Sequence, residues 1–271
     1  MTIDHSSQTA LITGASSGIG AALARRLAAR GTGLVLVARR TDRLEALAAE
    51  LRGAHGVRVE TVSADLGRPG AGRDLAAEVD RRGIRVTGLV NNAGVGADGA
   101  FADQDPDELE TLLALNVTAL VDVSRAFVGR LGTDGYLVNI ASMAAYQPIP
   151  GMAVYAASKA FVLSFTEALW WETRGSGPRT LVFSPGLTRT EFFDGIGTEG
   201  YSGHFQTPDE VAAALVRVLD RRRSVPSALS RAGNVVATAL PRLLGRRAAV
   251  LATARAAGAA GLMRKGRPAG V

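Results

Sequence analysis

The stretch TALITGASSGIG, residues 9–20, decides the fold of this chain. A short apolar run, TALIT, passes directly into a glycine- and serine-rich turn, and the helical pattern GAALARRLAARG follows. The glycines have the spacing G-x-x-x-G-x-G, at Gly14, Gly18 and Gly20. Small residues at such a turn let a pyrophosphate approach the backbone, and the helix start offers it free N–H groups. An ordinary Gly/Ser turn is the alternative, but the strand–turn–helix context favours a nucleotide site.

The same alternation continues along the chain. Further strands are predicted from apolar runs at residues 33–38, 57–62, 86–94, 135–142 and 179–186, with helical patterns between them, including long ones at about 106–131 and 152–174. The runs are continuous, as in strands that are covered on both faces. Helix ends are predicted near Gly31, Gly53 and Gly83. The chain is therefore predicted to be a single-domain α/β protein with a Rossmann-like, doubly wound parallel sheet, and its ligand is expected beyond the carboxyl ends of the strands.

The composition limits the kind of protein. With 271 residues, of which 47% are hydrophobic, the chain can bury one large core. It contains no cysteine, which excludes disulfides and suits a reducing compartment. No signal peptide is predicted, because the first residues lack a basic stretch followed by an apolar one, and the expected location is the cytoplasm. His5, His55 and His204 are scattered without ligand spacing, so no metal site is expected.

The net charge of +6 is concentrated at one end of the chain. Residues 221–271 carry 11 Lys or Arg and no acid, whereas residues 1–220 hold 20 basic and 25 acidic side chains. The high isoelectric point therefore gives little support for a nucleic-acid partner, and none is predicted. We divide the chain into a Rossmann domain, residues 1–228, and a basic, helical C-terminal extension, residues 229–271. The extension could lie on anionic lipid as a peripheral membrane contact, pack on a partner subunit, or form a solvated segment.

The second predicted strand ends in Ala38-Arg39-Arg40, with no acidic residue. An acid at this place would accept hydrogen bonds from the ribose 2′-hydroxyl of NAD(H), whereas an arginine suits the 2′-phosphate of NADP(H). Two solvated arginines are the alternative in a chain so rich in arginine. Given the glycine turn, Arg39 and Arg40 favour NADP(H) over NAD(H) as the cofactor.

One of only two lysines in the chain follows a tyrosine by four residues, in VYAASKAF at 154–161. On a helix this spacing places Tyr155 and Lys159 on one face. A compact ammonium favours the tyrosinate and is predicted to lower the pKa of Tyr155 toward neutrality, so that the phenol can exchange a proton with a substrate oxygen. An arginine, with its wide planar fork, would serve less well, which explains why a lysine stands here.

These motifs resemble those of the classical short-chain dehydrogenase/reductase family, in order and in spacing, over about residues 8–228. The resemblance implies a catalytic tetrad of Asn116, Ser142, Tyr155 and Lys159. It also implies a cofactor site formed by Gly14, Ser16, Ser17, Gly18, Ile19, Gly20, Arg39, Arg40, Asp65, Leu66, Asn92, Ala93, Gly94, Tyr155, Lys159, Pro185, Gly186, Thr188 and Thr190. Thr188 departs from the family's pattern, in which valine or isoleucine is expected.

The resemblance implies an oxidoreductase that moves a hydride between NADP(H) and a carbonyl or secondary alcohol. Tyr155 would act as general acid in reduction and as general base in oxidation, while Lys159 would also bind the nicotinamide ribose. Ser142 would donate a hydrogen bond to the carbonyl oxygen, and Asn116 would hold a water in a proton relay to Lys159. A catalytically silent, dinucleotide-binding regulatory protein is the alternative, and the intact tetrad argues against it.

The sequence defines the substrate less sharply. Residues 190–208 are glycine-rich and carry four aromatic side chains, as in a mobile lid, with a floppy surface loop as the alternative. A substrate pocket is expected from Ser142, Ala144, Gln147, Met152, Tyr155, Phe192 and Phe193. This composition predicts a largely apolar small-molecule substrate. The family resemblance also implies a homodimer or homotetramer.

Overall fold

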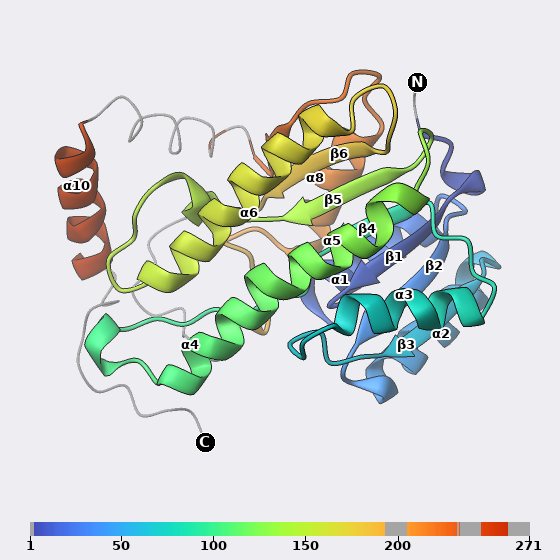
Figure 1. The fold of residues 1–271 in the computed structure, drawn as a ribbon, viewed down its shortest axis with the longest axis horizontal. Helices are drawn as coiled ribbons and strands as arrows, with labels where there is room; N and C mark the ends of the chain where they lie inside the picture. Colours follow the sequence, from blue (N-terminus) through green and yellow to red (C-terminus); the bar gives the residue numbers. More distant parts are fainter. Residues whose placement is uncertain (1–2, 193–204, 232, 234–244, 260–271) are drawn as a thin grey trace.

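The computed structural model describes residues 3–192, 205–231, 233 and 245–259, and it contains a seven-stranded parallel sheet (Figure 1). The strand order is β3-β2-β1-β4-β5-β6-β7, so the direction of winding reverses between β1 and β4. The strands are β1 (Thr9–Thr13), β2 (Gly33–Ala38), β3 (Val59–Ser63), β4 (Gly88–Asn91), β5 (Tyr136–Ile140), β6 (Arg179–Ser184) and β7 (Ser227–Leu229). The predicted doubly wound α/β fold is confirmed.

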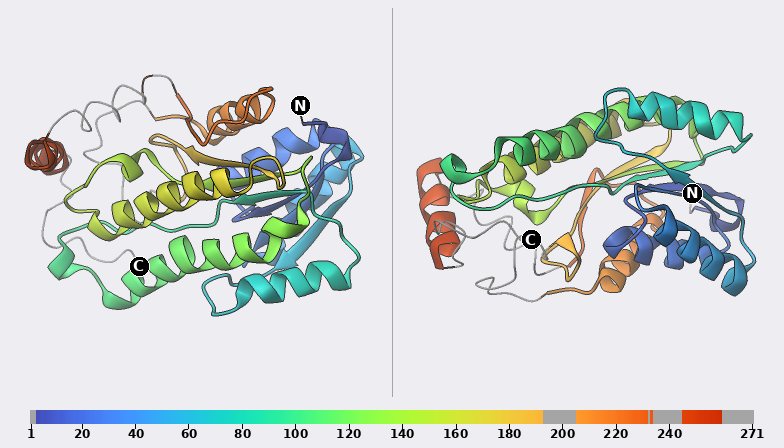
Figure 2. Two further views of the ribbon diagram at one scale, coloured as in Figure 1. Left: turned by 45° about the horizontal axis from the view of Figure 1, so that its top comes forward. Right: turned by 90° about the horizontal axis from the view of Figure 1, so that it is seen from below.

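Helices cover both faces of the sheet, as Figure 2 shows from two sides. The α-helices in the described residues are α1 (Gly18–Ala28), α2 (Thr41–His55), α3 (Ala71–Arg81), α4 (Pro106–Leu113), α5 (Leu120–Phe127), α6 (Ala153–Glu172), α8 (Pro208–Leu219) and α10 (Arg246–Ala259), of which α10 lies apart from the sheet. Successive strand residues enter different cores: Ile12 packs with α1, α2 and α8, while Leu11 packs with α3 and α5. This two-sided burial is the reason that the strands read as continuous apolar runs.

Several boundaries differ from the prediction. The long helix expected at 106–131 is divided, because residues Ala114–Ala119 form a π-helical stretch between α4 and α5. Gly53 does not end a helix; α2 continues to His55, and the left-handed residue that follows it is Gly56, with φ of 65°. The sequence argument did not identify β7, which has only three half-buried residues.

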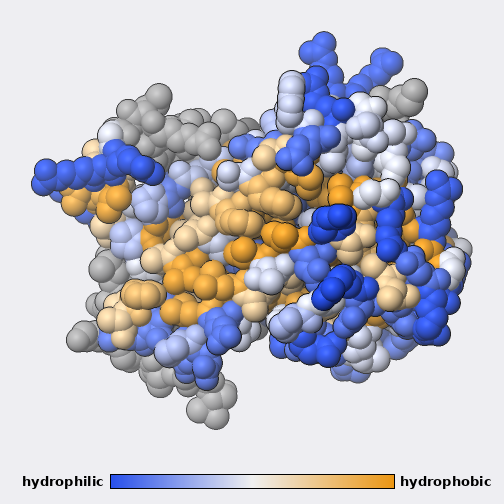
Figure 3. All heavy atoms as spheres, in the orientation of Figure 1, coloured by the Kyte–Doolittle hydropathy of each residue, from blue (hydrophilic) through white to orange (hydrophobic). Residues whose placement is uncertain are grey.

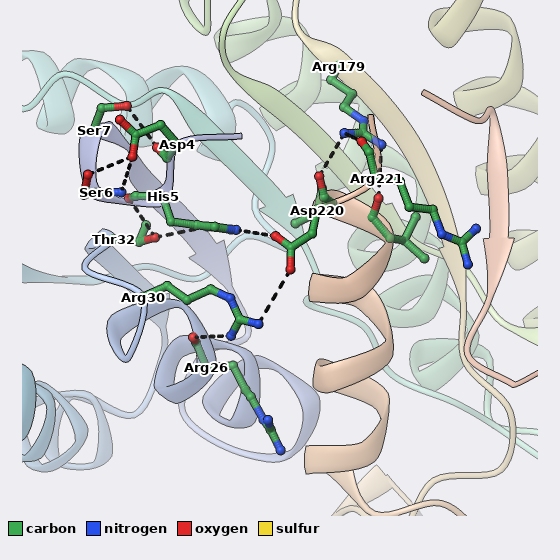
Figure 4. A network of polar contacts seen from close by, with 12 residues as sticks. Asp4, His5, Ser6, Ser7, Arg26, Arg30, Thr32, Arg179, Asp220 and Arg221 are labelled. Carbon is green, nitrogen blue, oxygen red and sulfur yellow. Dashed lines mark hydrogen bonds and ion pairs between the residues drawn. The ribbon is translucent and has the colours of Figure 1, made fainter. Parts of the chain in front are cut away.

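A polar network ties the start of the domain to the end of α8 (Figure 4). Asp220, directly after α8, accepts from the His5 ring at 2.8 Å and lies 3.6 Å from the Arg30 guanidinium. Arg179, at the start of β6, donates to four backbone carbonyls at the end of α8 and beyond it, those of Val218, Leu219, Arg221 and Arg223. Cations near a helix C-terminus satisfy its unpaired carbonyls, so these contacts fix α8 against α1 and the sheet.

One helical run, Pro106–Arg130, is long and apolar enough to cross a membrane by length and composition alone. The same test is passed by helices inside soluble domains. In this fold the run packs against the sheet and α3, where Leu120, Val123 and Phe127 are buried. These three residues therefore belong to the core of the domain.

Candidate functional site

A cavity of about 750 Å³ lies along the carboxyl ends of the strands. It is lined by the turn between β1 and α1, by the residues that follow β2, β3, β4, β5 and β6, and by the start of α6. In a doubly wound sheet this is where ligands bind, and the volume is in the range of small-molecule and cofactor sites. The cavity is therefore the candidate site.

The glycine turn after β1 is shaped for close backbone approach. Gly14 has φ of 65°, and a Cβ atom there would lie 2.9 Å from the side-chain nitrogen of Asn92. A Cβ atom on Gly20 would lie 2.4 Å from the carbonyl oxygen of Gly14. Only glycine fits at these two positions. The turn consequently presents its backbone, and the start of α1, directly to the cavity.

The end of β4 is bonded to the end of β1. The Thr13 hydroxyl accepts from the backbone N–H groups of Asn92 and Ala93, at 2.9 and 3.0 Å. The Asn92 side chain donates back to the carbonyl of Thr13 at 3.0 Å. Deeper in the sheet, the Asn91 amide donates to Asn139 of β5 at 2.9 Å. The two adjacent asparagines thus hold three neighbouring strand ends together beneath the cavity.

Arginines flank the same turn at the end of β2. Arg39 lines the cavity. Arg40 donates to the hydroxyls of Ser16 and Ser17, at 3.0 and 2.8 Å, and to the carboxylate of Glu191 at 2.8 Å. The side chains of Arg40 and Glu191 are 42% and 44% exposed, so solvent and ligands can reach both. This corner of the cavity is suited to binding an anionic group.

Tyr155 and Lys159 lie near each other on α6, and both are buried at the cavity wall. The lysine Nζ lies 5.8 Å from the centroid of the tyrosine ring and donates to the carbonyl of Ile140 at 3.2 Å. A hydrogen bond links the tyrosine side chain to Ser142, which follows β5. The sheet end and the helix thereby bring together a phenol, an ammonium and a hydroxyl.

The prediction that Lys159 lowers the pKa of Tyr155 is wrong in this structure, which contains the protein alone. Burial raises the pKa of the phenol to about 12, and the hydrogen bond with Ser142 opposes this only in part. Burial also lowers the pKa of Lys159 to about 8. Both shifts have the same cause, because a low-dielectric wall disfavours whichever form carries charge. The i, i+4 spacing gave the proximity of the two groups but not their desolvation.

Asn116 lies behind the cavity, in the π-helical stretch. Its amide donates to the carbonyl of Val95 and accepts from the N–H of the same residue, both at 2.9 Å, and it also donates to the Ser158 hydroxyl at 3.2 Å. A Cβ atom on Gly94 would lie 2.9 Å from the Asn116 side-chain oxygen and 3.3 Å from the Lys159 Nζ. Asn116 therefore fixes the segment after β4 directly beside the lysine.

The end of the cavity around Tyr155 is mainly apolar. Ala144, Met152 and Tyr155 belong to one buried cluster, against which Phe192 packs. The Phe192 ring lies 5.4 Å from the Tyr155 ring, and a Cβ atom on Gly96 would come within 2.3 Å of it. Gln147 adds a polar group to the lining. Phe193 lies outside the described residues.

The segment after β6 forms another part of the cavity wall. The Gly186 N–H donates to the Ser230 hydroxyl at 3.1 Å, and the Thr188 hydroxyl donates to the carbonyl of Gly186 at 2.9 Å. Thr190 reaches the glycine turn, where its methyl group would lie 3.1 Å from a Cβ atom on Gly18. The segment therefore spans the width of the cavity.

Most of the residues proposed from the sequence come together at this cavity. Gly20 and Asn116 do not line it and instead support it from behind. The cavity lining also includes residues that were not among the predicted site residues: Ala38, Ala64, Gly67, Val95, Gly96, Thr111, Leu115, Ile140, Ala141, Met143, Ile149, Leu187, Glu191 and Thr253. Thr253 carries no motif that could reveal it, because it comes from α10. Within the described ranges, no group of three or more His, Asp or Glu side chains is placed to hold a metal ion.

Known proteins share this fold and much of this sequence. The family model for the short chain dehydrogenase matches residues 8–199. The chain is 40% identical over 190 residues to sulfoacetaldehyde reductase 2 of Chromohalobacter salexigens, which covers 69% of this chain and 75% of that protein. It is 38% identical over 190 residues to serine 3-dehydrogenase of Agrobacterium fabrum, with coverage of 69% and 74%. A short-chain dehydrogenase of Sphingobium yanoikuyae in complex with NADPH matches with a TM-score of 0.77 and 36% identity, over 97% of this chain and 98% of that chain.

Proposed function

The chain belongs to the short-chain dehydrogenase/reductase family, and from this we propose that it transfers a hydride between NADP(H) and a carbonyl or secondary alcohol. The observation that carries the proposal is the meeting of Ser142, Tyr155 and Lys159 at the apolar end of a cavity that begins at a glycine turn. The similar short-chain dehydrogenase of Sphingobium yanoikuyae, whose structure is a complex with NADPH, supports the choice of cofactor.

The residues around the cavity fit a dinucleotide. The glycine turn and the start of α1 would hold the pyrophosphate, and Arg39 and Arg40 would hold the 2′-phosphate. Asp65 and Leu66 would lie at the adenine, and the segment from Pro185 to Thr190 at the nicotinamide. When bound, NADPH supplies the hydride, while the protein supplies orientation and electrostatics.

Tyr155 would move the proton of the reaction. Its hydroxyl holds a proton through the physiological range, since burial raises its pKa, and it can therefore donate to the oxygen of a carbonyl that is being reduced. Ser142 would bind the same oxygen. Lys159 lies close enough to stabilise negative charge that develops on the phenol as its proton leaves. In the reverse direction the phenol would first lose its proton, and the phenolate, stabilised by Lys159, would then accept the proton of the alcohol.

The substrate class that suits the cavity is a small, largely apolar carbonyl compound. Ala144, Met152 and Phe192 surround the Tyr155 ring and offer hydrophobic contact. Gln147 is the polar group that could orient the substrate. A catalytically silent dinucleotide-binding protein is the alternative, and it would bind the cofactor without turnover.

A panel of carbonyls and alcohols assayed with NADPH and NADH tests the function. We expect turnover with a preference for NADPH, and Tyr155→Phe should lower kcat/KM by about 10²- to 10⁴-fold because it removes the transferable proton. Tyr136→Phe is the matched control, since Tyr136 is also fully buried but lies in β5 outside the cavity lining. Tyr136→Phe should keep full activity. An active Tyr155→Phe variant would contradict the mechanism, and cofactor binding without turnover of any compound would favour the silent alternative.

We also propose a homodimer or homotetramer. Hydrophobic residues gather on the face formed by α4, α5 and α6, as Figure 3 shows. Leu113 and Phe161 on this face are 46% and 41% exposed, and Phe161 stacks on Phe165 with 5.9 Å between ring centroids. An exposed apolar face favours association, and in a homo-oligomer the partner is a second copy of this chain. Light scattering after size-exclusion chromatography measures the state, and a monomer at micromolar concentration would contradict it.

The division at residues 228 and 229 and the cytoplasmic location complete the proposal. β7, the last strand in the described residues, runs from Ser227 to Leu229, so the proposed division falls one residue before the end of the sheet. The lack of cysteine in 271 residues supports a reducing compartment. Fractionation of cells that produce the chain checks the location.

A further inference from the structure

Two arginines converge on one carboxylate beside the glycine turn. Glu191 accepts from Arg40 at 2.8 Å and, through its other oxygen, from Arg43. Arg40 and Arg43 come from the end of β2 and the start of α2, whereas Glu191 comes from the segment after β6. The ion pairs therefore connect the two sides of the cavity across its opening.

The location distinguishes this cluster from an ordinary surface pair. Glu191 and Arg40 both line the cavity, and Arg40 also donates to the hydroxyls of Ser16 and Ser17 in the glycine turn. Hydrogen bonds from Arg40 and Arg43 lower the pKa of Glu191 to about 2, so the carboxylate is charged at neutral pH. The side chains are 42 to 45% exposed and can exchange partners without opening the core.

Resting on the function proposed above, we infer that Glu191 occupies a two-arginine anion site that the 2′-phosphate of NADP(H) takes over. A phosphate beside Arg39 offers Arg40 and Arg43 more charge and more acceptor oxygens than a carboxylate does. Its arrival would release Glu191 from Arg40 and Arg43. A cofactor without that phosphate would leave the ion pairs intact.

The release has a consequence at the substrate end. Glu191 is followed directly by Phe192, whose ring packs on Tyr155. It is preceded by Thr190, which contacts the glycine turn at Gly18. Release of the carboxylate removes the ion pairs that hold this short segment to Arg40 and Arg43. Binding of the 2′-phosphate therefore changes the constraints on Phe192, which packs on Tyr155. Glu191 is thus a positioning residue that couples cofactor identity to the substrate pocket.

Binding of two small probes tests the inference without turnover. Adenosine 2′,5′-bisphosphate carries the 2′-phosphate, and adenosine 5′-monophosphate does not. In calorimetry, Glu191→Gln should bind the bisphosphate about two- to tenfold more tightly than the wild type, because the competing carboxylate is gone. Its affinity for the monophosphate should stay unchanged. In the Glu191→Gln background, Arg43→Gln should weaken the bisphosphate alone.

Glu78→Gln is the matched control. Glu78 also holds two arginines, Arg81 and Arg82, but it lies on α3 away from the cavity. This variant should change neither affinity. Unchanged bisphosphate binding in Glu191→Gln, or an equal change for both probes, would overturn the inference and leave the proposed function intact. If neither probe binds the wild-type chain, the proposed function fails and the inference fails with it.

Discussion

Burial of the charged Lys159 side chain lowers the stability of the fold. It is 6% exposed, and burial lowers its pKa from 10.5 to about 8. Between these two values the unfolded chain binds more protons at this amine than the folded chain does, so the free energy of unfolding rises with pH. The protein accepts this cost near neutrality because the ammonium lies beside the phenol of Tyr155.

The stability cost of Lys159 can be measured as a pH dependence. The free energy of unfolding should rise by about 2 kcal/mol from pH 8 to pH 10, and Lys159→Met should lose this rise. The chain is favourable for the measurement, because it has only two lysines and no cysteine to titrate in this window. Urea unfolding at both pH values, with wild type and variant side by side, provides the test. If the free energy of unfolding changed equally with pH in the wild type and in Lys159→Met, the lowered pKa of Lys159 would be contradicted. Above pH 10 the raised pKa of Tyr155 should reverse the trend, because the unfolded phenol loses its proton first.

Residue identities at the site were more predictable than their energetics. Tyr155, Lys159 and Ser142 could be found from spacing, since i, i+4 placement and strand ends bring them to one edge of the sheet. The direction in which the pKa of Tyr155 shifts could not be predicted from spacing, because it depends on burial by Ala144, Met152 and other residues from several elements.

At the scale of elements, α8 shows how a helix start is fixed. Thr207 accepts from the N–H of Glu210 at 3.2 Å, and the Glu210 side chain accepts from the N–H of Thr207 at 2.7 Å. Pro208 occupies the first helical turn, where its missing N–H has no cost. This reciprocal capping begins the helix that covers α1.

Removing the cap should weaken the fold without touching the chemistry. Thr207→Ala should lower the free energy of unfolding by about 1 kcal/mol, with kcat/KM unchanged. Thr41→Ala is the matched control, because α2 has no side-chain cap bond at its start. Its effect should stay within about 0.5 kcal/mol. Thermal and urea denaturation of both variants measure the difference. An equal loss in the two would contradict a role for the cap.

The sequence located elements where the physical signal is strong. β1 and β2 are continuous apolar runs, and their bounds match the prediction. β7 gives no such signal, because three half-buried residues are too few to show a pattern. The π-helical stretch that turns Asn116 inward was also missed, because apolar spacing continues through it and only the backbone hydrogen bonds change.

At the scale of the whole molecule, α10 connects the basic extension with the cavity. The sequence argument considered a membrane surface, a partner subunit or solvent. The structure instead places Thr253 in the lining of the cavity and buries Ala249. This helix lies beyond the last strand, more than 90 residues after Tyr155 in the chain, so no local pattern could reveal the contact. The described helix of the extension, α10, thus forms part of the cavity wall, while contact with a membrane or with a partner subunit stays a prediction.

A larger residue at Thr253 should restrict the substrates that fit. Thr253→Leu is expected to raise KM for bulky carbonyls about tenfold while leaving the smallest substrates unaffected, because it narrows one wall of the cavity. Ala252→Leu is the matched control, since Ala252 is exposed on the same helix. Steady-state kinetics over a series of carbonyls of increasing size checks the effect. Equal kinetics for the two variants would contradict a role for α10 in the wall.

The hydrogen bond between His5 and Asp220 joins positions 215 apart in the chain. During synthesis the strands of the nucleotide half leave the ribosome first, yet α8, which shields α1, comes out among the last elements. Until then the part of α1 that packs on α8 stays uncovered, so this part of the core is completed only after almost the whole domain has been synthesised.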